Sequence, residues 1–157
     1  MPQSQSTRSW ASSSPDDTRR IAVALARHLR VGDVVELDGE LGSGKTLFVI
    51  AAAEALGVHN AVSSPTYTIG NRYHGDGPDV SHLDLYRLDV LDADGWADLE
   101  PYFDDAVVFV EWPAAGRGIL PPPRVVVDLR HKGGDARLIL LTSHDSGLLT
   151  AVADSLI

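Results

Sequence analysis

GELGSGKT, at residues 39–46, fits the pattern G-x-x-x-x-G-K-[ST] of a phosphate-binding loop (P-loop) at every specified position. Its glycines allow the backbone to curl so that successive N–H groups point at one anion. The Lys45 ammonium would contact the β- and γ-phosphates, and the Thr46 hydroxyl could ligate Mg²⁺. We therefore predict that the chain binds a nucleoside triphosphate. The predicted phosphate-binding residues are Gly39, Leu41, Gly42, Ser43, Gly44, Lys45 and Thr46.

The residues on either side of this loop support the same interpretation. Residues 34–37, VVEL, form a short apolar run that predicts a strand, and residues 47–53, LFVIAAA, are compatible with a helix. A strand, a loop and a helix in this order place the phosphates at a helix N-terminus, where the helix dipole favours an anion. A glycine-rich turn that contains Lys-Thr by chance would not need these flanks.

Length and composition restrict the class of protein. The 157 residues suffice for one domain with one core. No apolar run approaches the ~20 residues that span a bilayer, and the polar N-terminus lacks the apolar segment of a secretory signal, so we expect a cytoplasmic protein without membrane association. The absence of cysteine excludes disulfides, thiolate zinc sites and thiol catalysis. Residues 1–13 are predicted to be a disordered tail, followed by a single P-loop domain at 14–157.

The charge of the chain argues against a direct grip on nucleic acid. The formal net charge is −9, and residues 76–105 are rich in acids with Arg87 as their only cation. Proteins that hold nucleic acid by themselves usually present a basic surface, because neutralising phosphates supplies most of the affinity. Any role on a nucleic acid would therefore need a partner that holds the polymer.

Further elements are predicted by local patterns. Ser14 is a typical helix N-cap and Pro15 suits the first helical position, so a helix should run from there to about Arg30. Residues 106–110, AVVFV, form the continuous apolar run of a strand that is buried on both faces. Residues 125–129 and 137–141 read as two strands joined by a glycine turn, which predicts a C-terminal hairpin.

Two acids compete for the position beside the magnesium ion. P-loop enzymes hold Mg²⁺ with the loop hydroxyl and with an acid at the end of a neighbouring strand. Glu111 follows the most apolar strand of the chain, and Asp84 lies in the weaker strand at 82–86. Each could instead be a solvated carboxylate. We expect that both reach one metal, one directly and one through water, and that either could polarise the attacking water.

Three other features of the sequence have both a structural and a functional interpretation. His82 is more often a satisfied histidine of a strand than a catalytic group. Trp112 would be a packing residue, but its place directly after Glu111 makes it a candidate to border the γ-phosphate site. Thr66 and Tyr67 lie where a switch segment would be expected, although an ordinary turn explains them equally well.

Four strings in order resemble one family. They are GELGSGKT at 39–46, SSPTYT at 63–68, HLDLYRL at 82–88 and VEWP at 110–113. Together they resemble the TsaE (YjeE) family, the bacterial ATPases of the tRNA threonylcarbamoyladenosine pathway, over roughly residues 14 to 141. A P-loop is common to many families, whereas the other three strings are much more specific.

The resemblance implies an α/β, P-loop NTPase-like three-layer fold with a mostly parallel central sheet and a C-terminal β-hairpin. It implies weak ATP hydrolysis that is coupled to a complex of TsaB and TsaD, which modifies the adenosine beside the anticodon; this subunit would act on tRNA only through them. In the family, the positions of Lys45 and Thr46 bind phosphate and Mg²⁺, those of Asp84 and Glu111 serve metal binding and hydrolysis, and that of Trp112 lines the site.

The resemblance also suggests where the base would bind, and two other functions compete with it. In relatives, the helix start near Pro15 and the hairpin near Arg137 approach the base. One rival is a small nucleotide or metabolite kinase, which typically needs several arginines, yet only Arg72 and Arg87 lie between Lys45 and Arg117. The other rival is a nonhydrolytic ATP-dependent binding switch. A GTPase would need an Asn-Lys-x-Asp motif, which the sequence lacks.

Overall fold

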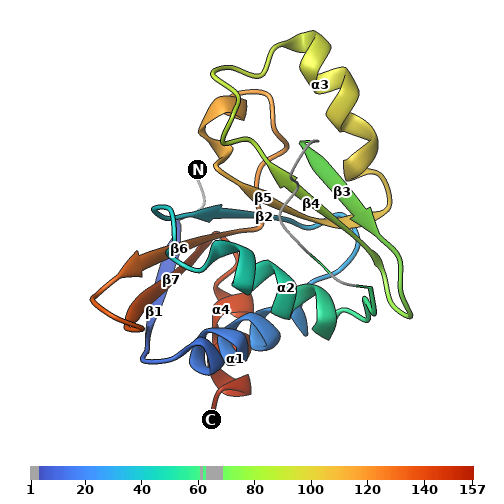
Figure 1. Ribbon diagram of the computed structural model, residues 1–157. Coiled ribbons are helices and arrows are strands. Elements are labelled where there is room, and N and C mark those ends of the chain that lie inside the picture. Colours follow the sequence, from blue (N-terminus) through green and yellow to red (C-terminus); the bar gives the residue numbers. More distant parts are fainter. Residues whose placement is uncertain (1–3, 61, 63–68) are drawn as a thin grey trace.

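The structure is a computed structural model that describes residues 4–60, 62 and 69–157 (Figure 1). Strands and helices alternate through most of the described chain. The elements are β1 (Ser6–Ser12), α1 (Pro15–Ala26), β2 (Val34–Asp38), α2 (Lys45–Ala55), β3 (Gly70–Tyr73), β4 (Asp79–Asp84), α3 (Ala93–Leu99), η1 (Glu100–Phe103), β5 (Ala106–Glu111), η2 (Pro113–Gly116), β6 (Val125–His131), β7 (Arg137–Ser143) and α4 (Ser146–Ser155).

All strands join one sheet in the order β1-β7-β6-β2-β5-β4-β3. The central strands β6, β2, β5 and β4 are parallel to one another, and β7, β1 and β3 add antiparallel pairs toward the two edges. The predicted α/β fold and the C-terminal hairpin, β6–β7, are confirmed. The antiparallel edges make the whole sheet mixed, and its parallel part is the centre, where the P-loop connects β2 to α2.

Helices cover both faces of the sheet. Figure 1 shows α1, α2 and α4 on one face and α3 on the other. The side chains of β5 alternate between the two cores: Val107 and Phe109 pack in the core with α1 and α2, whereas Val108 and Val110 pack in the core near α3. This confirms the prediction that residues 106–110 are buried on both faces. No helix among the described residues is long and apolar enough to cross a membrane.

The N-terminal segment corrects one prediction. Residues 1–13 were expected to be disordered, but Ser6–Ser12 forms β1, which pairs in antiparallel register with β7. The ladder satisfies the backbone of a polar segment, and the Thr7 hydroxyl bonds to that of Thr142 at 2.9 Å. Trp10 adds apolar contact because its ring packs against the core below the sheet. The polar composition of the segment did not predict these contacts, because they join residues that are far apart in the chain.

Helix α1 begins as predicted and ends earlier. The Ser14 hydroxyl accepts a hydrogen bond from the backbone N–H of Asp17 at 3.2 Å, and Pro15 occupies the first turn. The helix ends at Ala26 instead of near Arg30. The backbone N–H of Arg30 donates to the Asp33 carboxylate at 2.9 Å, so these residues form the turn that leads into β2.

Arg124 connects three elements, and its replacement should destabilise the fold. Its guanidinium donates to the Asp33 carboxylate at 2.7 Å, to the His28 carbonyl at 2.8 Å and to the Asp145 carboxylate at 3.1 Å. Arg124→Met would leave the buried Asp33 carboxylate without its cation, so we expect the free energy of unfolding to fall by about 2 kcal/mol or more in urea titrations.

The exposed pair of Arg130 and Asp128, with a 3.0 Å contact, provides the control for this change. Arg130→Met should cost less than about 1 kcal/mol, because solvent already screens the exposed pair. Equal losses in the two variants would contradict the structural role of Arg124.

Candidate nucleotide-binding site

The P-loop connects the end of β2 to the first turn of α2, as the sequence predicted. Gly44, the N-cap of α2, has a φ of +105°, a conformation that favours glycine. A Cβ atom on Gly39 would lie 2.5 Å from the Ser43 Oγ and 2.7 Å from the carbonyl oxygen of Leu129, so no larger residue fits there. These two glycines allow the loop to close tightly around the start of the helix.

Lys45 is held inside the site by its own loop. The residue is buried, and its Nζ donates to the carbonyl oxygens of Gly39 at 2.5 Å and of Glu40 at 3.0 Å. The same Nζ lies 4.2 Å from the centre of the Trp112 ring, which is a cation–π distance. Burial lowers the pKa of Lys45, and the Glu111 carboxylate is the largest opposing influence.

Trp112 lies beside Lys45, where a residue that borders the predicted phosphate site should be. Its backbone has a φ of +55°, which is uncommon for a residue with a side chain. The ring packs against that of Tyr86 with 4.8 Å between centroids. This uncommon backbone conformation turns the chain directly after β5, and the Trp112 ring then lies beside Lys45.

Glu111 and Asp84 end adjacent parallel strands and are register partners. Glu111 is buried, and both of its carboxylate oxygens lie 3.4 Å from the Thr46 hydroxyl. Asp84 is half-buried, and its carboxylate accepts a hydrogen bond from the backbone N–H of Tyr86 at 2.9 Å. The structure therefore brings both candidate acids and the loop hydroxyl to one edge of the sheet, with Glu111 closest to Thr46.

His82 is a residue of the site that sequence reasoning undervalued. Its imidazole is completely buried, and its Nε2 lies 2.5 Å from an oxygen of Glu111. Its Nδ1 has no hydrogen-bond partner among the described residues. The available signal was strand alternation: His82 and Asp84 are two residues apart and share a face of β4, and Glu111 is the register partner of Asp84.

One cavity of about 300 Å³ contains most of the predicted site. The buried Lys45 ammonium and the N-terminus of α2 provide the positive charge that a phosphate needs. The Thr46 hydroxyl and two carboxylates provide the oxygen ligands that Mg²⁺ prefers, so the donor set fits both groups. The cavity is lined by Leu41, Gly42, Gly44, Lys45, Thr46, Leu47, Asp84 and Glu111.

Arg137 contacts the P-loop from β7, whereas Pro15 lies at the start of α1, the helix that follows β1. The Arg137 guanidinium donates to the carbonyl oxygens of Ser43 at 3.0 Å and of Gly42 at 3.2 Å, so it contacts the P-loop backbone directly. Pro15 begins α1 three residues after Ser12, the register partner of Arg137. Their predicted contact with a base stays a prediction. Arg137 also has a structural role, because it binds two backbone carbonyls of the P-loop.

The sequence model of the family described as "Threonylcarbamoyl adenosine biosynthesis protein TsaE" matches residues 12–139. The chain belongs to the TsaE family. The protein of this name from Bacillus subtilis (strain 168) is 36% identical over 135 residues, which cover 85% of this chain and 84% of that protein. The TsaE protein of Streptomyces coelicolor is 47% identical over 98 residues, which cover 60% of this chain and 66% of that protein.

A solved structure supports the fold of this TsaE family member over nearly its whole length. The crystal structure of Bacillus subtilus YdiB matches with a TM-score of 0.79 and 29% sequence identity, covering 98% of this chain and 97% of that one. Three of the four strings that carried the TsaE resemblance, at 39–46, 82–88 and 110–113, meet around the cavity. The fourth, 63–68 with Thr66 and Tyr67, lies outside the described residues.

The contact between Arg137 and the loop leads to a test in this TsaE protein. Arg137→Lys keeps the charge but loses the planar fork that reaches two carbonyls, so the loop should be less well ordered. We expect about tenfold weaker binding of an ATP analogue in calorimetry, in the range that a lost charge-assisted bond gives. Arg130→Lys, on the same hairpin, is the control and should bind as the parent does. Equal affinity in both variants would contradict the role of Arg137.

Proposed function

We propose that this TsaE family protein is the ATPase subunit of tRNA threonylcarbamoyladenosine biosynthesis, and that it hydrolyses ATP when bound to TsaB and TsaD. The observation that carries the proposal is the Thr46–Glu111 contact at 3.4 Å, beside a P-loop whose lysine is buried. A loop hydroxyl next to a strand-end carboxylate is the arrangement with which P-loop enzymes hold Mg²⁺ on their nucleotide.

Each residue of the site has a proposed task. The N–H groups of Gly42–Thr46 and the Lys45 ammonium bind the phosphates, and Thr46 holds Mg²⁺ together with Glu111 or Asp84. Bound Mg²⁺ neutralises charge on the phosphate oxygens. The acid that does not ligate the metal orients the attacking water, and Trp112 excludes other water from that side.

The need for partners has two supports. Lys45 donates two of the three N–H groups of its ammonium to the carbonyls of Gly39 and Glu40, so it can give a γ-phosphate more than one hydrogen bond only after it releases a carbonyl. Partner binding beside the loop could favour that change, which would explain weak hydrolysis by the isolated subunit. The net charge of −9 also favours contact with tRNA through TsaB and TsaD rather than directly. We infer that the protein is located in the cytoplasm, because tRNA is modified there.

A kinase has less support at this site. Phosphoryl transfer to a second charged substrate typically requires several arginines around the transferred group. Arg72, one of the two arginines between the P-loop and Arg117, is paired with Asp79 at 3.0 Å, and both belong to the β3–β4 edge hairpin. No observation favours a nonhydrolytic switch over hydrolysis, because the site combines the lysine, the hydroxyl and two acids that hydrolysis needs.

Phosphate release tests the proposal directly. The purified chain with ATP and Mg²⁺ should release phosphate slowly, and TsaB, TsaD and tRNA together should raise the rate and yield modified tRNA. Chelating Mg²⁺ with EDTA should stop release in both cases. An unchanged rate with the partners and no modified tRNA would refute the partner-dependent function, and transfer of phosphate to a small acceptor would favour the kinase.

A further inference from the structure

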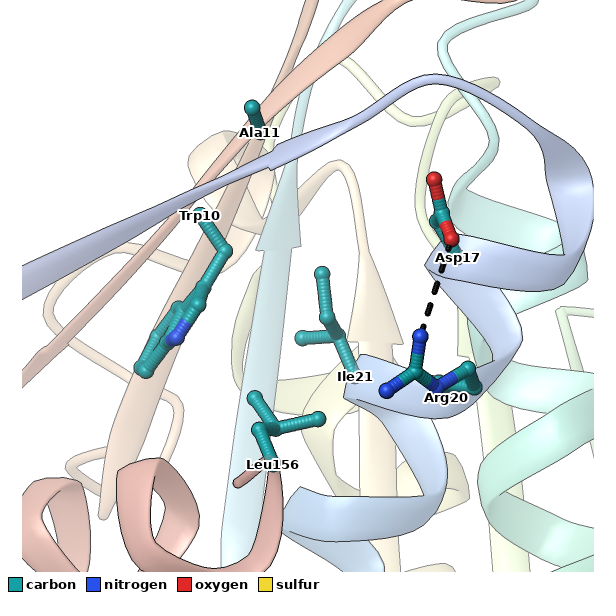
Figure 2. A pocket seen from close by; sticks show the side chains of 6 residues that line it. All are labelled: Trp10, Ala11, Asp17, Arg20, Ile21 and Leu156. Carbon is teal, nitrogen blue, oxygen red and sulfur yellow. Dashed lines mark ion pairs between the residues drawn. The ribbon is translucent and has the colours of Figure 1, made fainter.

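A second cavity lies on the far side of α1 from α2, between β1, α1 and the C-terminus (Figure 2). It has a volume of about 170 Å³. Figure 2 shows the Trp10 ring extending from β1, with Ile21 of α1 on the opposite side and Leu156 near the C-terminus below them. These three side chains form an apolar wall, and the cavity is large enough for one bulky apolar side chain.

Arginines form the other wall. A neighbouring cavity of about 260 Å³ shares Arg20 and Leu156 with the first and extends along α1 past Arg19 and Arg27. We call the two cavities together the α1 groove. From Asp17 to Arg27 the helix rises about 15 Å, which an extended chain of about five residues would match.

The arginines of the α1 groove are largely free to bind an anion. The Arg19 and Arg27 side chains are exposed, and neither has a hydrogen bond or an ion pair with another described residue. Arg20 is 3.9 Å from the Asp17 carboxylate and keeps 68% of its side chain exposed, so that pair is weak. The three guanidiniums are therefore largely available to carboxylates of a partner.

The charge of the groove contrasts with the rest of the chain. Residues 1–30 contain five of the 13 cationic side chains and two of the 22 acidic ones, so their formal charge is +3. Residues 31–157 contain the other eight cationic and 20 acidic side chains, so their formal charge is −12. Such an acidic body repels a long polyanion such as RNA, because the phosphates extend beyond the groove, whereas a short segment with a few carboxylates fits inside it.

We propose that the α1 groove binds a short, extended, acidic segment of a partner protein, with a bulky apolar side chain against Trp10, Ile21 and Leu156 and carboxylates on Arg19, Arg20 and Arg27. The edge of the sheet supports an extended ligand. In the described part of the chain, β1 is bonded to β7 on one side, and its other side is a sheet edge to which a peptide backbone can add. The site is separate from the P-loop and does not depend on the proposed ATPase activity.

Fluorescence anisotropy of a labelled peptide, DELEFD, with the full chain tests this site. The parent should bind it, and the amide analogue NQLQFN and the apolar-to-serine analogue DESESD should both bind at least about fivefold more weakly. Arg27→Glu should also weaken binding by about fivefold or more, because an attraction becomes a repulsion. Arg30→Glu is the matched control: it changes the net charge equally, three residues away and outside the groove, and should bind as the parent does.

Three outcomes would overturn the proposal. They are no binding of DELEFD by the parent, equal binding of DELEFD and NQLQFN, and equal effects of Arg27→Glu and Arg30→Glu. A tRNA transcript that binds the parent, and that Arg27→Glu releases while the peptide fails to bind, would assign the groove to RNA instead. Matching thermal melting curves of the two variants establish that the comparison is between folded proteins.

Discussion

Lys45→Ala is expected to weaken ATP binding by on the order of 100-fold or more, because it removes the buried cation that we propose binds the phosphates. Alanine keeps the helical backbone of α2, whose first residue is Lys45. The two carbonyls that Lys45 contacts belong to the loop itself, and the buried Glu111 carboxylate keeps its contacts with Thr46 and His82. Isothermal titration with ATP and Mg²⁺ measures the effect.

The chain offers one matched control for this change. Lys132 is the only other lysine, and it is exposed at the turn between β6 and β7. Lys132→Ala removes the same charge and should bind ATP as the parent does. If Lys45→Ala binds ATP within a few-fold of the parental affinity, the P-loop is not the ATP-binding site, whatever the control shows.

The frame of this site could be predicted because its signals are local. The P-loop residues are consecutive, and all three glycines of the motif, Gly39, Gly42 and Gly44, have a positive φ. The apolar run at 106–110 fixed β5, and the end of that run placed Glu111 at the carboxyl edge of the sheet. Parallel strands end at one edge, so the convergence of Asp84, Glu111 and the loop follows from the element order.

The contacts that the sequence did not predict join residues far apart in the chain. Ser6–Ser12 is polar, and its strand exists through pairing with β7, more than 120 residues later. The His82–Glu111 contact depends on the relative register of two parallel strands, which neither strand encodes alone. The same holds for Arg137, whose guanidinium reaches the P-loop from β7, more than 90 residues later in the chain. Local propensity cannot specify such distant pairings.

Glu111→Gln is expected to lower ATP turnover with TsaB, TsaD and tRNA by about 100-fold or more while ATP binding changes little. Glutamine has the same shape and can still accept a hydrogen bond from the imidazole of His82 or from Thr46. It cannot provide the negative charge that holds a metal or polarises water. Glu100→Gln, at an exposed position in η1, is the control and should keep the parental rate.

A magnesium titration of the turnover rate separates the two tasks that Glu111 and Asp84 could share. If Glu111 ligates the metal, Glu111→Gln should recover part of its rate at high Mg²⁺, and Asp84→Asn should remain slow at every concentration. If Glu111 orients the water, the two variants should exchange these behaviours. Because Glu111 is buried with both carboxylate oxygens 3.4 Å from the Thr46 hydroxyl, we expect the first result. Parental turnover rates in both variants would show that neither acid takes part in ATP hydrolysis.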